Sequence, residues 1–224
     1  IWQNKKGSWP VRMLRRFVFD FLFPHKARMR WAVGLLGIYQ RSGLPWLARK
    51  TKLVHVLPPA LRDMEKVLPP LPSVNEMKRR PEHVLPWQPA RRRVAFFAGC
   101  LMDTVFMATN NATIRLLQMA GCEVVIPASQ TCCGALHGHS GEKEKAKWLA
   151  KRNIEAFEAV DADVIVTNAG GCGAYLFEYG HLLQDDEAWA ERARRFAAKV
   201  KDFSDVLVEL KFHERPLQAR AEIV

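Results

Sequence analysis

The sequence lacks the features that mark several common classes of protein. It has no run of 18 or more uncharged apolar residues, so no ordinary transmembrane helix is expected. No G-x-G-x-x-G follows a predicted strand, which removes the usual argument for a dinucleotide cofactor. No stretch combines the apolar core and A-x-A site of a secretory signal. A helix-turn-helix or RNA-binding signature is also missing, so no nucleic acid partner is predicted.

Acidic residues are nearly absent from the first part of the chain. Residues 1–50 carry eleven Lys and Arg side chains but one acidic residue, Asp20, whereas residues 94–224 have a formal charge of −4. Large apolar and aromatic residues alternate with the cations in WPVRMLRRFVFDFLFPHKARMRWAVGLLG. Two interpretations stay open: core helices with long basic side chains at the surface, or a peripheral surface for anionic membrane lipids.

The chain divides into three predicted parts. Residues 1–68 form a basic helical segment, with helices expected over 11–23, 27–43 and from position 58 onward. Six prolines in residues 69–92 predict an extended linker. Residues 93–224 form an α/β module, described next.

Three apolar runs in residues 93–224 read as buried strands, namely RVAFFAG, CEVVIP and ADVIVTNAGG. A helical pattern follows each of them, which predicts a parallel sheet of three or more strands with crossover helices. Asp103 is expected to cap the first of these helices. The face that this helix buries is predicted to hold Val105, Ala108, Ala112, Leu116 and Met119. The next helix is predicted to bury Ala146, Leu149, Ala150, Ile154 and Phe157.

Four of the five cysteines follow predicted strands. Cys100 follows the first strand, Cys132 and Cys133 follow the second, and Cys172 follows the third. Because the carboxyl ends of parallel strands meet at one edge, where open α/β sheets bind ligands, we expect these thiols to converge. Four thiolates suit zinc or an iron–sulfur cluster. Cys122 begins a strand and is expected to be a small buried side chain.

Glycine, histidine and asparagine residues surround the cysteines in the sequence. Gly134 and Gly171 would let the backbone approach a cofactor closely, with N–H groups available to sulfur. His137 and His139 are expected to donate hydrogen bonds near the ligands or to line the pocket, or else to lie in a solvated loop. Asn168 is a further candidate to line the pocket.

The segments FAGC, CCGALHGHSGE and NAGGCGAYLFEYG together resemble the CCG cysteine-rich domain family. That family includes a component of heterodisulfide reductases, lactate-utilisation proteins and glycolate oxidase iron–sulfur subunits. CCGALHGHSGE and NAGGCGA are most similar to the glycolate oxidase branch, and LPPALRDMEKVLPPLPS resembles the segment before the first CCG module there. The resemblance covers roughly residues 10 to 210.

The resemblance implies an electron-transfer role in an oxidoreductase. The ligands of an iron–sulfur cluster, of the 4Fe-4S kind, would be Cys100, Cys132, Cys133 and Cys172. The expected partners are flavin-containing subunits that oxidise glycolate to glyoxylate and a membrane surface or quinone that accepts the electrons. The expected location is the cytoplasm, on the cytoplasmic face of the inner membrane.

The sequence also departs from the family pattern. Tyr175 stands where the reductase-type motif has its last cysteine, and neither ferredoxin-type cysteine runs nor a second CCG module is present. The chain therefore resembles a central piece of a longer protein. Two alternative functions stay open at this point: a docking scaffold with no cluster or with zinc, and a catalytic cluster module like that of heterodisulfide reductases.

Overall fold

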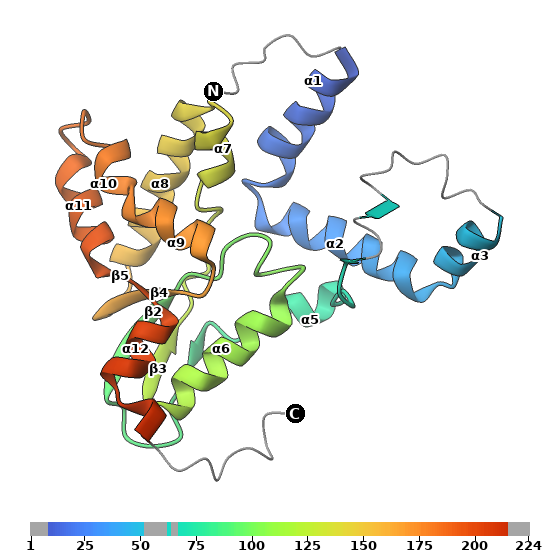
Figure 1. Cartoon of the computed structure of the whole chain (residues 1–224). Coiled ribbons are helices and arrows are strands. Elements are labelled where there is room, and N and C mark those ends of the chain that lie inside the picture. The colour runs from blue at the N-terminus through green and yellow to red at the C-terminus, as the bar shows by residue number, and fades with distance from the viewer. Residues whose placement is uncertain (1–8, 52–61, 64–66, 215–224) are drawn as a thin grey trace.

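The computed structural model of the chain describes residues 9–51, 62–63 and 67–214. Figure 1 shows an α/β part that holds the sheet and a helical part, α1 to α3, that extends away from it. The helical part begins with three α-helices and one π-helix, which are α1 (Trp9–Arg16), η1 (Phe17–Leu22, the π-helix), α2 (Lys26–Arg41) and α3 (Leu44–Lys50). The expected helix over 11–23 is thus present, with its second half wound as a π-helix. Of the helix expected from position 58, residues 58–61 and 64–66 lie outside the described residues, and residues 68–73 are not helical.

Residues 69–92 contain more regular structure than an extended linker would have. A short helix, α5 (Val74–Lys78), starts at Ser73, whose side chain and that of Glu76 form a capping box. The two-residue strand β1 (His83–Val84) then pairs antiparallel with β3 (Cys122–Val125). The prolines around these elements obscure both signals in the sequence.

The sheet confirms the predicted α/β class. Its order is β1-β3-β2-β4-β5, and every pairing except that of β1 is parallel. The remaining strands are β2 (Arg92–Phe96), β4 (Val164–Thr167) and β5 (Val200–Asp202). The sequence pattern does not predict β5, because its three residues lie inside a stretch with a helical pattern.

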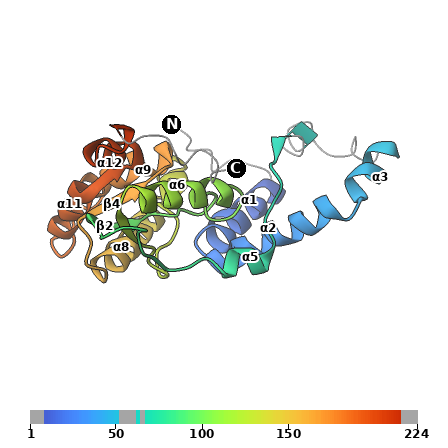
Figure 2. The same ribbon diagram turned by 90° about the horizontal axis from the view of Figure 1, so that it is seen from below.

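Helices cover both faces of the sheet, as Figure 2 shows with α6 and α12 on one side and α8 on the other. One core lies between the sheet and α8 to α11, and a second lies under α6 and α12. The helices of the module are α6 (Met107–Met119), α7 (Ala135–His139), α8 (Lys143–Glu158), α9 (Gly170–Phe177), α10 (Tyr179–Leu182), α11 (Ala190–Lys199) and α12 (Phe203–Glu209), followed by the 3-10 turn η3 (Phe212–Glu214).

The buried face of α6 differs from the predicted one, whereas that of α8 is as predicted. In α6 the buried residues are Asn110, Thr113, Ile114 and Leu117. The apolar pattern is misleading here, because two of these four side chains are polar. In α8 all five predicted residues are buried. The N-cap position of α6 is Phe106, so the predicted capping role of Asp103 is wrong.

Candidate metal centre

The loops after β2, β3 and β4 bring four cysteine side chains together at the carboxyl edge of the sheet. The Sγ atoms of Cys100 and Cys132 lie 3.6 Å apart. The sulfur of Cys133 is hydrogen-bonded to those of Cys132 and Cys172, and Cys172 lies in the first turn of α9. The Sγ atom of Cys172 also lies 3.8 Å from the point where a Cβ on Gly99 would stand. The predicted convergence of the thiols is therefore present in the fold.

The four thiols differ in pKa because they are close together and largely buried. Hydrogen bonding with Cys132 lowers the pKa of Cys100, and hydrogen bonding with Cys132 and Cys172 lowers the pKa of Cys133. Hydrogen bonding with the neighbouring sulfurs, together with burial, raises the pKa of Cys132 and that of Cys172.

Backbone N–H groups and glycines complete the turn that carries the vicinal pair. The N–H of Gly134 donates to the Sγ of Cys132 at 3.5 Å. Gly134 has a φ of 89°, a left-handed conformation that places α7 directly after the cysteines. Gly171 is exposed in α9, with no atom within 4 Å of an added Cβ.

Substitution of Gly134 tests how strictly the turn geometry matters. We expect Gly134→Ala to lower the free energy of unfolding by about 1–2 kcal/mol, because a side chain at this φ is strained. Gly141→Ala is the matched control, since Gly141 has a φ of 79° and lies outside the cysteine turn. Both variants should lose a similar amount of stability in thermal unfolding. Only Gly134→Ala should also reduce iron uptake. Equal iron uptake by the two variants would show that the backbone conformation at Gly134 is not needed to position the cysteines.

The two predicted histidines have different surroundings. His137 is fully buried, and its Nε2 donates to the carbonyl oxygen of Phe19 in η1 at 2.9 Å. Its ring also packs edge-on against that of Phe19, and its Nδ1 is buried with no hydrogen-bond partner among the described residues. His139 is exposed and contacts the ring of Tyr175. His137 therefore joins α7 to η1 in the helical part of the chain.

Asn168 joins the loop after β4 to α6. Its Nδ2 donates to the Oδ1 of Asn110 at 3.0 Å and to the Oγ1 of Thr113 at 2.8 Å. Its Oδ1 is buried and has no hydrogen-bond partner within the described ranges. These contacts explain why α6 turns two polar residues toward the sheet.

The cysteine turn depends on two buried side chains that the sequence patterns do not identify. Asn153 of α8 accepts from the N–H of Thr131 at 2.7 Å and donates to the carbonyl of Cys132 at 3.0 Å. Tyr179 receives a hydrogen bond from Asn153 and donates to the carbonyl of Cys133 at 2.7 Å. The available signal is a single asparagine on the otherwise apolar face of α8.

Tyr175, at the position of the missing cysteine, is half-buried beside the thiols. Burial raises the pKa of Tyr175, and the nearby sulfur of Cys133 raises it further. Its hydroxyl lies 2.1 Å from where a Cβ on Gly138 would stand, so the phenol covers α7 at a glycine. Tyr175 therefore occupies space against α7 beside the sulfurs.

Cys122 lies away from this site. It begins β3, pairs in register with Arg92 and is fully buried. Burial raises the pKa of its thiol to about 11. Its position at the amino end of a strand agrees with the expectation of a small buried side chain.

The donor set fits an iron–sulfur cluster in its chemistry. Four thiols, three on two loops and one in the first turn of α9, with a backbone N–H directed at one sulfur, are the groups that such clusters use. Within the described residues, no group of three or more His, Cys, Asp or Glu side chains forms a ready site for a single metal ion.

Two segments of the chain match known families. Residues 10–68 match the family described as the linker region of the glycolate oxidase iron–sulfur subunit, and residues 94–177 match the cysteine-rich CCG domain. A Bacillus subtilis protein named as a probable glycolate oxidase iron–sulfur subunit is 59% identical over 217 residues, which is 97% of this chain and 49% of that protein. The chain carries a linker region of the glycolate oxidase iron–sulfur subunit type followed by a CCG domain.

Relatives with another name match about half of this chain. Lactate utilization protein A of an Exiguobacterium species is 44% identical over 117 residues, 52% of this chain and 48% of that protein. The protein of that name from Geobacillus thermodenitrificans is 40% identical over 118 residues, 53% of this chain and 48% of that protein. The chain spans about half the length of these curated relatives. All four converging cysteines lie inside the CCG domain.

Proposed function

We propose that this chain is the part of a glycolate oxidase-type complex that relays electrons through an iron–sulfur cluster. The ligands of the cluster are Cys100, Cys132, Cys133 and Cys172. The observation that carries the proposal is the gathering of these four thiols from three loops at the carboxyl edge of the sheet. The matches to the linker region and to the CCG domain, and the similarity to a probable glycolate oxidase iron–sulfur subunit, support it.

The proposed cluster is of the 4Fe-4S type, because four thiolates can supply one ligand to each iron. When bound, it would take up and release single electrons. The chain's own residues hold and shield it: Cys132 and Cys133 are nearly fully buried, and Asn153 and Tyr179 fix their backbone. A direct role toward the cluster stays a prediction for five further residues, which are Gly134, His137, His139, Asn168 and Gly171.

The proposed electron donor is a flavin-containing subunit that oxidises glycolate to glyoxylate, and the proposed acceptor is a membrane quinone.

Anaerobic reconstitution with iron and sulfide, followed by optical and electron paramagnetic resonance spectra, tests the cofactor. We expect a broad charge-transfer absorption that bleaches on reduction, with a paramagnetic signal in the reduced chain. Zinc uptake without sulfide would contradict the proposal and would instead support a docking scaffold.

The surface of the helical front supports a membrane-facing role. In α2 the exposed side chains of Trp31, Leu35 and Ile38 form one stripe, opposite the buried Met29 and Val33. The surrounding segment is strongly cationic, which complements the negative charge of anionic lipid. None of the helices in the described part of the chain has the length and apolar character needed to cross a bilayer. We therefore propose peripheral attachment to the cytoplasmic face of the inner membrane.

Flotation with lipid vesicles tests this attachment. We expect the chain to float with phosphatidylglycerol vesicles at low salt, and less at high salt because salt screens the cations. Replacing Trp31, Leu35 and Ile38 together with serine should reduce the bound fraction by roughly tenfold, because apolar area no longer enters the interface. Trp148→Ser is the matched control, since Trp148 is a half-exposed tryptophan on α8. Equal flotation of the triple variant and this control would contradict the proposed face.

A further inference from the structure

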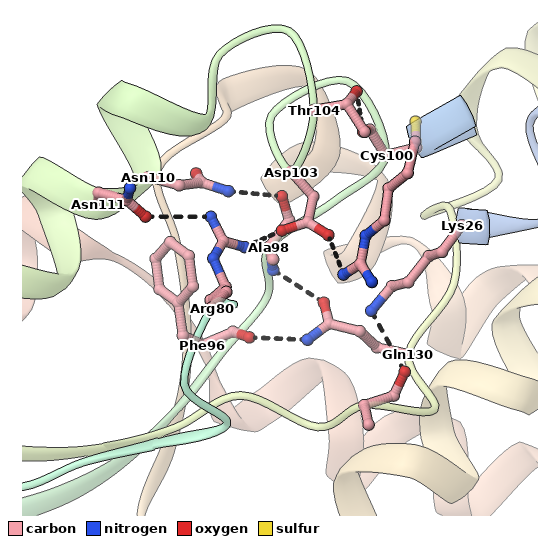
Figure 3. A network of polar contacts seen from close by, with 12 residues as sticks. Lys26, Arg80, Phe96, Ala98, Cys100, Asp103, Thr104, Asn110, Asn111 and Gln130 are labelled. Carbon is pink, nitrogen blue, oxygen red and sulfur yellow. Dashed lines mark hydrogen bonds and ion pairs between the residues drawn. The ribbon is translucent and has the colours of Figure 1, made fainter. Parts of the chain in front are cut away.

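A buried carboxylate connects the loop that carries Cys100 to two segments that precede the sheet. Asp103 is 4% exposed and lies three residues after Cys100. Arg80 forms an ion pair with one carboxylate oxygen of Asp103, as Figure 3 shows, and Arg30 lies 3.3 Å from the other. Arg30 comes from α2, and Arg80 comes from the turn after α5. One side chain of the CCG domain thus joins three separate parts of the chain.

The charge of Asp103 is compensated only when its loop, α2 and the turn after α5 are packed together. A buried carboxylate is unfavourable unless cations and hydrogen bonds surround it, and removing one partner leaves the other charge uncompensated. Arg80 is itself only 7% exposed, so it too depends on Asp103. A network of this kind therefore selects one position of the loop relative to α2 and α5.

The loop is held at both sides of Cys100. Before the cysteine, the N–H of Ala98 donates to Gln130 at 2.8 Å and the carbonyl of Ala98 accepts from Asn110 at 2.9 Å. After it, the hydroxyl of Thr104 donates to the carbonyl of Cys100 at 2.9 Å. Figure 3 shows these contacts around the same loop. Beyond the bonds within the loop itself, the carboxylate of Asp103 anchors the loop to other segments.

Apolar packing supports the same contact between the front of the chain and the CCG domain. Val33 of α2, Met77 of α5 and Leu71, which precedes α5, form a small buried cluster. Val105 and Met107, which lie two and four residues after Asp103, pack against it. The loop therefore continues from its ionic anchor into a core that the front segments provide.

We propose that Arg30 and Arg80 are positioning residues of the cysteine site that act through Asp103. They hold the loop so that the sulfur of Cys100 reaches Cys132. The proposal rests on the proposed function in one respect, that Cys100 is a cluster ligand. In this proposal α2 and the turn after α5 help to position the metal centre and do more than link it to the rest of the chain.

Disulfide formation in the metal-free, reduced full chain tests this positioning. With diamide as oxidant, two thiols give up two protons and two electrons as an S–S bond forms, and mass spectrometry identifies each pair. Asp103→Asn should slow the Cys100–Cys132 bond by about tenfold, because the loop loses its anchor. The Cys133–Cys172 bond should form at its normal rate, because neither of those cysteines lies on this loop. A general loss of structure would change both rates, so their ratio isolates positioning.

Glu209→Gln is the matched control, because Glu209 pairs with two cations, Arg92 and Lys201, away from the cysteines. It should leave both disulfide rates unchanged. If Asp103→Asn does not fold, Arg30→Met decides, since Arg30 is 26% exposed and more easily replaced. Arg30→Met should change the ratio in the same direction. An unchanged ratio of the two disulfide rates, or an equal change in both rates, would overturn this proposal. If the ratio changes but the chain fails to bind iron, only the proposed cluster is contradicted.

Discussion

Replacing Cys133 with alanine is expected to abolish cluster binding. Cys133 is the central sulfur of the site, because it is hydrogen-bonded to both Cys132 and Cys172. Removing it leaves three thiols and takes away the contact between the second and third loops. We expect iron and acid-labile sulfide to fall by at least about tenfold relative to the unchanged chain, since a 4Fe-4S cluster ordinarily uses four cysteine ligands.

Cys122→Ala is the control for this experiment. Cys122 is also fully buried, but it lies at the amino end of β3 and so away from the cysteine site. The control should lose some stability through the small cavity and should keep its iron. If the two variants retain the same amount of iron and sulfide, Cys133 is not a ligand.

Replacing Asn153 with leucine is expected to produce the largest loss of stability. The substitution leaves the N–H of Thr131, the carbonyl of Cys132 and the hydroxyl of Tyr179 without their buried partner. Each unpaired group costs about 1–3 kcal/mol, and the costs do not add fully, so we expect about 3 kcal/mol in total. In a chain of this size that lowers the melting temperature by roughly 10 °C.

Two further variants separate the hydrogen bonds of Asn153 from its volume. Tyr179→Phe removes one hydroxyl and should cost about 1–2 kcal/mol, since the carbonyl of Cys133 loses a donor. Asn75→Leu, at an exposed position of α5, should change stability by less than about 0.5 kcal/mol. Thermal unfolding of the metal-free chain measures all three. A loss at Asn153 no greater than that at Asn75 would show that the network does not hold the turn.

The convergence of the cysteines could be predicted from the sequence because it follows from topology alone. Three apolar runs, each followed by a helical pattern, require a parallel sheet, and such a sheet brings its carboxyl ends to one edge. Cys100, Cys132 and Cys172 each follow one of these runs, so their meeting requires no knowledge of side-chain contacts. Short strands escape the same reasoning, because the two residues of β1 and the three of β5 are too few to show a period.

The residues that support the cysteines could not be predicted in this way. Asn153, Asn110 and Asp103 face inward because each binds a loop that is distant in the sequence or a segment that precedes the sheet. Hydrophobic periodicity treats such residues as surface or as caps, which is why it predicts the wrong face of α6 and an N-cap role for Asp103. Polar residues on a buried helix face become interpretable only when the partner loop is in place.

The iron and acid-labile sulfide content of the anaerobically reconstituted chain tests the central claim most directly. The account predicts about four of each per chain, as a single 4Fe-4S cluster contains. A chain that binds zinc without sulfide, or that binds no metal while all four thiols are reduced, would contradict it.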